Sequence, residues 1–225
     1  MSVTAWTSIL VVMLSAPRLS AAELSTYRGF TFGAGIAASA EQAGLKPADA
    51  KAIHKRPAVL QEMEWQLRPQ VIEGSPGRDP VREGLLCLLD GKLYRIVITY
   101  DRYRVEGMTV EDMVEAISLS YGAAERPDTE IVFHSNYAET AKVLARWQDA
   151  EHAYDLVRTG DRSSFALVLY AKRQDALAQV AIREASRLDS LDAPGRALEA
   201  EKKRAEDERR ALEVSRTVNK PNFRP

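Results

Sequence analysis

Three histidines and their acidic neighbours are the residues of this chain best suited to acid–base or metal chemistry. They are His54, His134 and His152, and no two of them have the His-x-x-x-His spacing that places two zinc ligands on one helical turn. His134 ends an expected strand, and His152 stands close to Asp149. A small-ligand or hydrolase site at His134, Asp149 and His152 is therefore the alternative hypothesis for this protein. It requires at least two of these side chains within about 4 Å of one another in a concave pocket.

Other catalytic patterns are incomplete in the sequence. Gly74-Ser75-Pro76-Gly77 departs from the Gly-x-Ser-x-Gly motif of hydrolases and lies in an expected loop. Glu62 and Glu64 share a strand face as paired carboxylates would, but exposed strand faces ordinarily carry such residues. The glycines from Gly29 to Gly35 lack the strand and helix that surround a phosphate-binding loop. The sequence predicts a non-enzymatic protein with no catalytic residue, cofactor or metal.

Two groups of residues are candidates for contact with another protein. Arg102, Tyr103 and Arg104 follow an expected strand and suit an anion or a peptide, although solvated loop charge is their more common role. Trp65 and Trp147 are interpreted first as core residues. Either tryptophan becomes an anchor for a protein partner if it is exposed on a concave sheet face.

Composition and charge exclude several classes of partner and covalent link. The 225 residues carry a formal net charge of −1, and a near-neutral protein lacks the field that attracts nucleic acid or an anionic membrane. The single cysteine, Cys87, excludes an internal disulfide. Because it lies in the apolar run from Leu85 to Leu89, it is interpreted as a buried thiol.

Residues 1–22 have the layout of a cleavable secretory signal. An apolar core from Ile9 to Leu14 leads to the small residues Ser20-Ala21-Ala22, and no Lys or Arg precedes the core. Cleavage after Ala22 would give a periplasmic or secreted protein that meets the membrane only during export. No cysteine follows the apolar run where a lipid anchor would need it. An uncleaved membrane anchor is the alternative for this segment.

The elements that would position these residues are helices and antiparallel strands. Asp90-Gly91 predicts a type I′ hairpin turn between strands Leu85–Leu89 and Lys92–Tyr100. Thr109 and Gly122 are the expected caps of a helix over Val110–Tyr121. The other expected elements are a helix at 36–43 ended by Gly44, a helical turn in 47–53, a strand from Gln61, a loop at 69–80, and strands at 130–134, 142–148, 154–157 and 163–170, with a turn at 159–161.

The C-terminal part of the chain differs in kind from the rest. A helical pattern begins at Arg173, and Pro194-Gly195 is expected to end it. Residues 191–225 form a charged helical tail with a frayed end, in which Leu191, Leu198, Ala205 and Leu212 are seven residues apart. One apolar residue per heptad falls short of a firm coiled-coil seam. A solvated charged helix and a partner-dependent coiled coil through Leu198 and Leu212 both remain open.

The order of elements repeats, as a helix followed by three strands, in possible halves 29–104 and 105–190 of an α+β domain at 23–190. Phe32-Gly33 leads the first helix and Trp65 lies in a strand; Gly107-Met108-Thr109 leads the second helix and Trp147 lies in a strand. This order resembles the α+β modules of the beta-lactamase-inhibitor-like class, which includes the BamE (SmpA/OmlA) envelope family. That family's lipidated cysteine is missing here. The chain also resembles uncharacterised exported proteins of proteobacteria, which implies no activity.

Together these patterns predict an exported α+β protein that presents an antiparallel sheet to a protein partner. The charged tail would be a second contact or a spacer.

Overall fold

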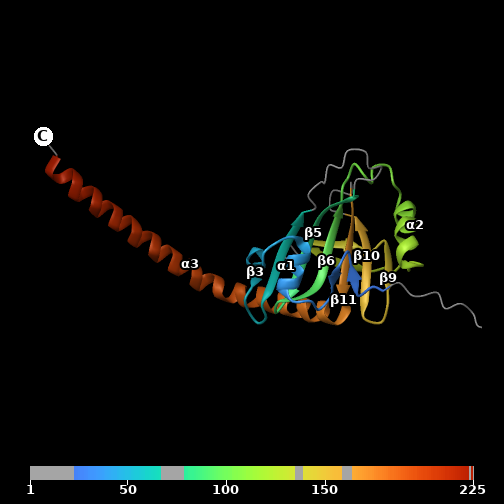
Figure 1. The fold of residues 1–225 in the computed structure, drawn as a ribbon. Coiled ribbons are helices and arrows are strands. Elements are labelled where there is room, and N and C mark those ends of the chain that lie inside the picture. The colour runs from blue at the N-terminus through green and yellow to red at the C-terminus, as the bar shows by residue number, and fades with distance from the viewer. Residues whose placement is uncertain (1–22, 67–78, 135–138, 159–163, 223, 225) are drawn as a thin grey trace, which may run out of the picture.

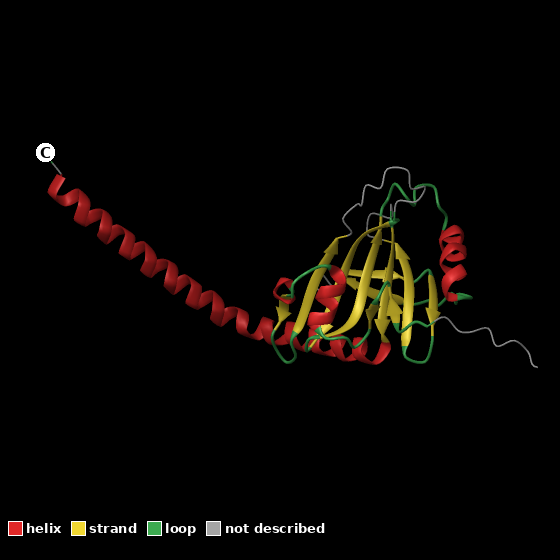
Figure 2. Ribbon diagram, in the orientation of Figure 1, coloured by secondary structure: helices red, strands yellow, loops and turns green. Residues whose placement is uncertain are grey.

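The computed structural model describes residues 23–66, 79–134, 139–158, 164–222 and 224. They form an α+β fold with a seven-stranded antiparallel sheet and a C-terminal helix that projects far beyond it (Figure 1, Figure 2). The strands are β1 (Thr26–Tyr27), β2 (Phe30–Thr31), β3 (Lys51–His54), β4 (Leu60–Gln66), β5 (Val81–Leu89), β6 (Lys92–Tyr100), β7 (Glu130–His134), β8 (Glu139–Lys142), β9 (Ala145–Gln148), β10 (His152–Arg158) and β11 (Phe165–Ala171). The helices are α1 (Ile36–Ala43), the 3-10 turn η1 (Pro47–Asp49), α2 (Val110–Tyr121) and α3 (Lys172–Asn222).

The main sheet joins two three-stranded meanders. Its strand order is β3-β4-β5-β6-β11-β10-β9, and β6 pairs with β11 through partners such as Ile98 and Leu167. Helix α1 precedes the first meander and α2 the second, which matches the predicted order of a helix and three strands only in part. Strand β3 and the separate hairpin β7-β8 are additions to this plan. The resemblance to the beta-lactamase-inhibitor-like class stays a prediction.

The strongest local signals of the sequence produce the expected elements. Asp90 and Gly91 have φ values of 48° and 73°, as a type I′ turn requires, and they join β5 to β6. At the start of α2 the Thr109 hydroxyl accepts a hydrogen bond from the Asp112 amide, and the Asp112 carboxylate accepts one from the Thr109 amide. Both predictions are confirmed.

One expected strand is divided. Residues 142–148 were expected to form a single strand, but β8 ends at Lys142 and β9 begins at Ala145. The single strand is wrong because Val143 and Leu144 turn from one pairing to another: the amide of Val143 bonds to Thr129, beside β7, and that of Leu144 bonds to Leu156 in β10.

The two faces of the sheet have different covers. One face carries the main core, which includes Met63, Leu86, Ile96, Leu167 and Trp147 and is closed by residues of β1, β2, α1 and α2. The opposite face carries two smaller apolar clusters. The first lies under α3 and the second under the β7-β8 hairpin. Burial on both faces explains why the central strands are almost continuously apolar.

The predicted break of the C-terminal helix at Pro194-Gly195 is wrong, because α3 runs without interruption from Lys172 to Asn222. Pro194 lacks the amide that would bond to the Ser190 carbonyl, but the helix continues across this one missing bond. Two side chains add hydrogen bonds to other carbonyl groups in the turns before it. The Arg196 guanidinium donates to the Asp189 carbonyl at 2.8 Å, and the Ser190 hydroxyl donates to the Ser186 carbonyl at 2.9 Å. The helix bends as it leaves the sheet instead of ending (Figure 1).

Several predictions fall outside the described residues: the signal at 1–22, most of the loop at 69–80, and the turn at 159–161. Within the described residues, no helix has both the length and the apolar character needed to cross a membrane.

Candidate interaction surface

Helix α3 consists of two regions with opposite surroundings. We call residues 172–189 the anchor, because this region packs on the sheet, and residues 191–222 the arm. The anchor begins where the Lys172 amide donates to the Glu151 carbonyl at 2.8 Å and its ammonium donates to the Asp149 carbonyl at 2.6 Å. These two bonds fix the first turn of α3 against the β9-β10 turn.

A buried ion pair holds the next turn of the anchor. Arg95 of β6 donates from Nε and Nη2 to the two Asp175 oxygens, at 2.7 and 2.9 Å. Its Nη1 donates to the Val132 carbonyl of β7 at 2.6 Å. Burial works against the charged form of Arg95, but the charge and hydrogen bonds of Asp175 outweigh it and raise the pKa of Arg95 above its ordinary value. One guanidinium thus joins the sheet, α3 and the β7-β8 hairpin.

Small side chains allow the anchor to approach the sheet closely. Ala178, Ala181 and Ala185 are buried along one face of α3, and the first two pack with Cys87 and Tyr94. Burial raises the pKa of the Cys87 thiol well above its usual range. The prediction of a buried cysteine is confirmed.

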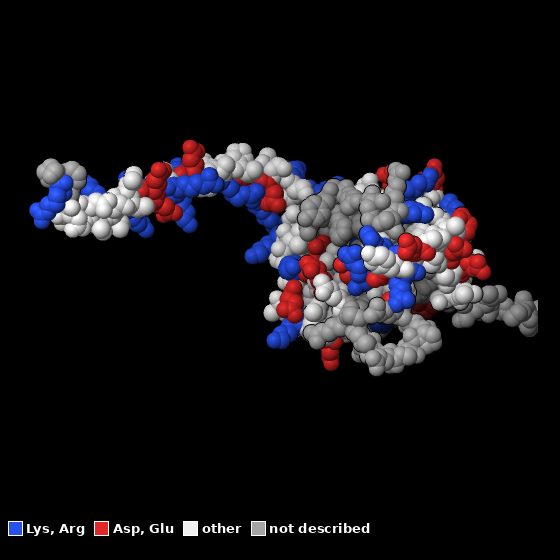
Figure 3. Space-filling view, turned by 90° about the horizontal axis from the view of Figure 1, so that it is seen from above, with Lys and Arg blue, Asp and Glu red and all other residues white. Residues whose placement is uncertain are grey.

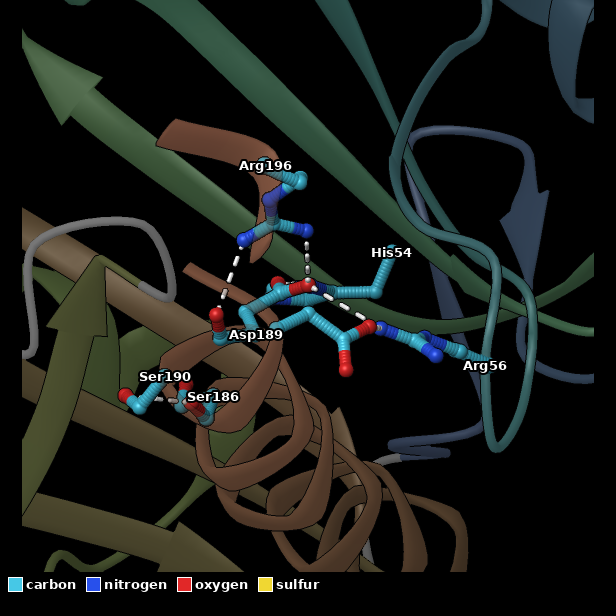
Figure 4. A network of polar contacts seen from close by, with 7 residues as sticks. His54, Arg56, Ser186, Asp189, Ser190 and Arg196 are labelled. Carbon is cyan, nitrogen blue, oxygen red and sulfur yellow. Dashed lines mark hydrogen bonds and ion pairs between the residues drawn. The ribbon is translucent and has the colours of Figure 1, made fainter. Parts of the chain in front are cut away.

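A polar cluster marks the point at which α3 leaves the sheet (Figure 4). Asp189 lies 3.5 Å from His54 Nδ1 and 3.2 Å from Arg196 Nη1. Arg56, just beyond β3, hydrogen-bonds to Asp192 and holds the pKa of that carboxyl below its usual range. Four charged side chains and one histidine therefore tie the root of the arm to β3 and the turn after it.

The arm beyond this cluster makes no described contact with the rest of the molecule. Its described residues are all exposed, including Leu191, Leu198 and Leu212 at 63%, 52% and 65%. Acidic and basic side chains alternate along it (Figure 3). Ion pairs within the arm, such as Lys202 with Glu199 at 2.9 Å, support the helix locally. The structure thus places the two predicted contacts Leu198 and Leu212 on an open helical surface.

The two tryptophans lie in the first strand of each meander. Trp147 is 1% exposed, and its indole N–H donates to the Gly122 carbonyl at 3.0 Å, at the end of α2. Its burial removes Trp147 from the candidate contacts, because a side chain buried in the core has no surface for a partner. Trp65 is half-buried and packs edge-on against Phe30. Gly84 lies beneath the Trp65 ring, where a Cβ would come within 2.6 Å of the indole.

The basic loop after β6 is exposed. The Arg102 guanidinium stacks over the Tyr103 ring, 4.5 Å from its centroid, and donates to the phenol oxygen at 2.9 Å. Arg104 is also exposed. These residues form an accessible basic and aromatic patch, but nothing in their contacts selects one ligand.

The alternative site is only partly assembled by the described residues. His152 Nδ1 lies 3.4 Å from the Asp149 carboxylate, whereas the His134 side chain lies outside the described residues. Asp149 Oδ1 also accepts hydrogen bonds from the amides of Glu151 and His152. The His152 ring stacks on Phe32. These contacts cap the β9-β10 turn, so the Asp149–His152 pair has a structural explanation that needs no ligand.

Among the described residues, one small pocket lies beside His54. The pocket beside His54, lined also by Ile53, Leu60, Tyr94 and Ile182, measures about 10 Å³, room for about one water molecule. In the part of the chain that the structure describes, no three His, Cys, Asp or Glu residues are grouped to hold a metal ion. Glu64 pairs with Lys51 on the surface, at 2.9 Å, and Glu62 lies opposite Cys87.

No protein-family model, no curated protein and no solved structure matches this chain. The described architecture and its surfaces are therefore the basis for any functional conclusion.

Proposed function

We propose that this chain is a non-enzymatic protein-interaction component of the cell envelope, with the sheet domain as its base and the arm as its contact element. The observation that carries this proposal is the exposed arm. An isolated helix gains most of its stability from packing an apolar face, and no described element packs against the exposed apolar side chains of the arm. A partner along Leu191, Leu198 and Leu212 would supply that packing.

Export is the second element of the proposal and is supported by the sequence of residues 1–22. Leu24 is the first described core residue, so cleavage after Ala22 would leave the described fold whole. Sequencing the amino terminus of protein isolated from the native envelope tests this point. A mature protein that begins at Glu23 is expected. Protein that keeps residues 1–22 and stays with the membrane after a salt wash would favour the anchor instead.

The contact element is tested by photocrosslinking in the native envelope. A photoreactive amino acid replaces Leu198 or Leu212 in the full chain, and the matched control replaces Leu119, a leucine of α2 that is 87% exposed. We expect protein adducts from both arm positions and few from position 119. Adducts of any mass support the proposal. Equal labelling from all three positions, or none from the arm, would reject the arm as the contact element.

A further inference from the structure

We propose that the arm pairs with the arm of a second copy of this chain, in parallel and in register, so that the protein works as a two-headed dimer. This inference rests on the proposed function, because it names the partner of the same surface. It is carried by the pattern of apolar and charged residues on the exposed part of α3.

Four apolar residues form one line along the arm, and Val214 and Val218 lie off it. Leu191, Leu198, Ala205 and Leu212 follow each other at intervals of seven, and Asn219 occupies the next position. On an α-helix this spacing drifts only slowly around the axis, so the line runs along one side. A single asparagine at such a position is the device by which parallel two-stranded coiled coils fix their register.

The charged residues closest to this line have opposite sign on its two sides, whereas Glu199, Glu206 and Glu213 lie farther round the helix. Glu201 and Glu208 come three residues after Leu198 and Ala205 and lie on one flank. Lys202, Arg209 and Arg216 come four residues after Leu198, Ala205 and Leu212 and lie on the other flank. All five side chains are exposed. Each arm therefore has an acidic edge and a basic edge along its apolar line.

This segregation selects one orientation. In a parallel pair related by a two-fold axis along the helices, the left edge of one helix faces the right edge of the other, so the acidic edge meets the basic edge twice. In an antiparallel pair like edges meet, and Glu201 and Glu208 would face glutamates while Arg209 would face basic residues. Opposite charges attract and like charges repel across such edges, which favours the parallel pair.

The size of the arm permits this pairing. At 1.5 Å per residue the arm is about 48 Å long, and it projects beyond the sheet domain (Figure 1). One apolar residue per heptad gives a weaker seam than the usual two. We therefore expect a reversible dimer whose population rises with protein concentration.

Disulfide trapping in the purified mature chain tests both the partner and the orientation. Leu212→Cys places a thiol on the line, and the native Cys87 is buried and does not compete. A parallel in-register pair brings the two copies of position 212 together, so mild oxidation should give a covalent dimer of twice the chain mass. The matched control Lys203→Cys lies on the opposite side of the arm and should give at least about tenfold less dimer.

A mixture of Leu198→Cys and Leu212→Cys chains reports the other orientation, because those positions meet in an antiparallel pair centred on Ala205. Preferential 198–212 disulfides would overturn the parallel arrangement. Light scattering that finds only monomers at all concentrations up to about 1 mM would overturn self-pairing. If photocrosslinking at Leu198 or Leu212 then captures a different protein, the proposed function stands while this inference fails.

Charge reversal gives an independent measurement. Glu201→Lys with Glu208→Lys makes both edges basic, and Lys202→Glu with Arg209→Glu and Arg216→Glu makes both acidic. Each variant alone should dimerise about tenfold more weakly than the parent, and an equal mixture of the two should recover pairing. Unchanged dimerisation in both variants would contradict the role of the edges.

Discussion

The anchor and the arm belong to one continuous helix but present opposite surfaces. The anchor places Asp175, Ala178, Ala181 and Ala185 against the sheet, whereas every described residue of the arm is exposed. In the anchor, small side chains and one buried charge determine where the helix lies. In the arm, larger apolar side chains are spaced among charged residues and contact no other described element. The anchor serves the fold, and we propose that the arm serves a partner outside it.

The junction between the two regions explains how one helix can pack on the sheet at one end and project away from it at the other. Asp189 and Asp192 bind His54, Arg56 and Arg196 just before and after the bend, so the arm leaves the sheet in a defined direction. A freely hinged arm would pay more conformational entropy to meet a partner than one that is already held. If the arm binds a partner as proposed, the cluster lowers the entropy cost of that contact.

The largest expected effect comes from the buried charge of the anchor. Asp175→Asn leaves the Arg95 guanidinium buried without its anionic partner, and breaking a buried pair in this way costs about 3–5 kcal/mol. We expect urea unfolding of the full chain to show that loss. The control is Glu199→Gln, which breaks the exposed pair with Lys202 and should cost less than about 0.5 kcal/mol. Equal losses in the two variants would contradict the contrast between anchor and arm.

The next largest effect is expected from replacing Pro194 at the junction. A proline inside a helix is about 3 kcal/mol less favourable than alanine, so Pro194→Ala should stabilise the root of the arm. Hydrogen exchange of the amides near residue 194 should slow by up to about a hundredfold, because that free energy corresponds to roughly two powers of ten. Amides at 205–216 serve as an internal control and should not change. Equal slowing along the whole arm would show that Pro194 acts on the arm generally and not on its root.

Packing of the anchor gives a third, smaller effect. Ala178 is fully buried against the sheet, so Ala178→Leu forces extra methyl groups into a filled space, at a cost of about 1–3 kcal/mol. Ala200→Leu adds the same atoms to the exposed arm and should leave the free energy of unfolding within about 0.5 kcal/mol of the parent. Both variants are compared by urea unfolding. A destabilised Ala200 variant would mean that the arm is packed in solution.

Local signals explain why much of the fold could be predicted from the sequence. The Asp90-Gly91 turn, the Thr109 cap and the alternation around Met63 each depend on residues within a few positions of each other. The heptad spacing likewise pointed to Leu198 and Leu212, which the structure leaves exposed. Such patterns are physical constraints that a short segment satisfies by itself.

The remaining features depend on residues that are far apart in the sequence. Arg95 and Asp175 are separated by 80 positions, and Arg56 and Asp192 by 136, so spacing could not pair them. A signal was present for the first pair. Arg95 is a charged residue within a strand that is apolar on both faces, which requires a buried partner. The expected break at Pro194 failed for a different reason: a proline removes only one backbone hydrogen bond, and the helix continues across it.

The smallest expected effect concerns pH at the junction. Arg56 lowers the pKa of Asp192 in the folded protein, so this ion pair contributes stability above the ordinary carboxyl pKa and loses it as pH falls through the lowered value. Arg56→Gln should therefore lower the urea midpoint slightly at pH 7. The difference from the parent should shrink as the pH drops below about 4 and vanish when Asp192 is protonated in both states. The control is Glu199→Gln, which is remote from the junction. Its urea midpoint shows how acid affects stability when the Arg56–Asp192 pair is intact. A difference that grows toward low pH would show that Arg56 acts through something other than the carboxylate of Asp192.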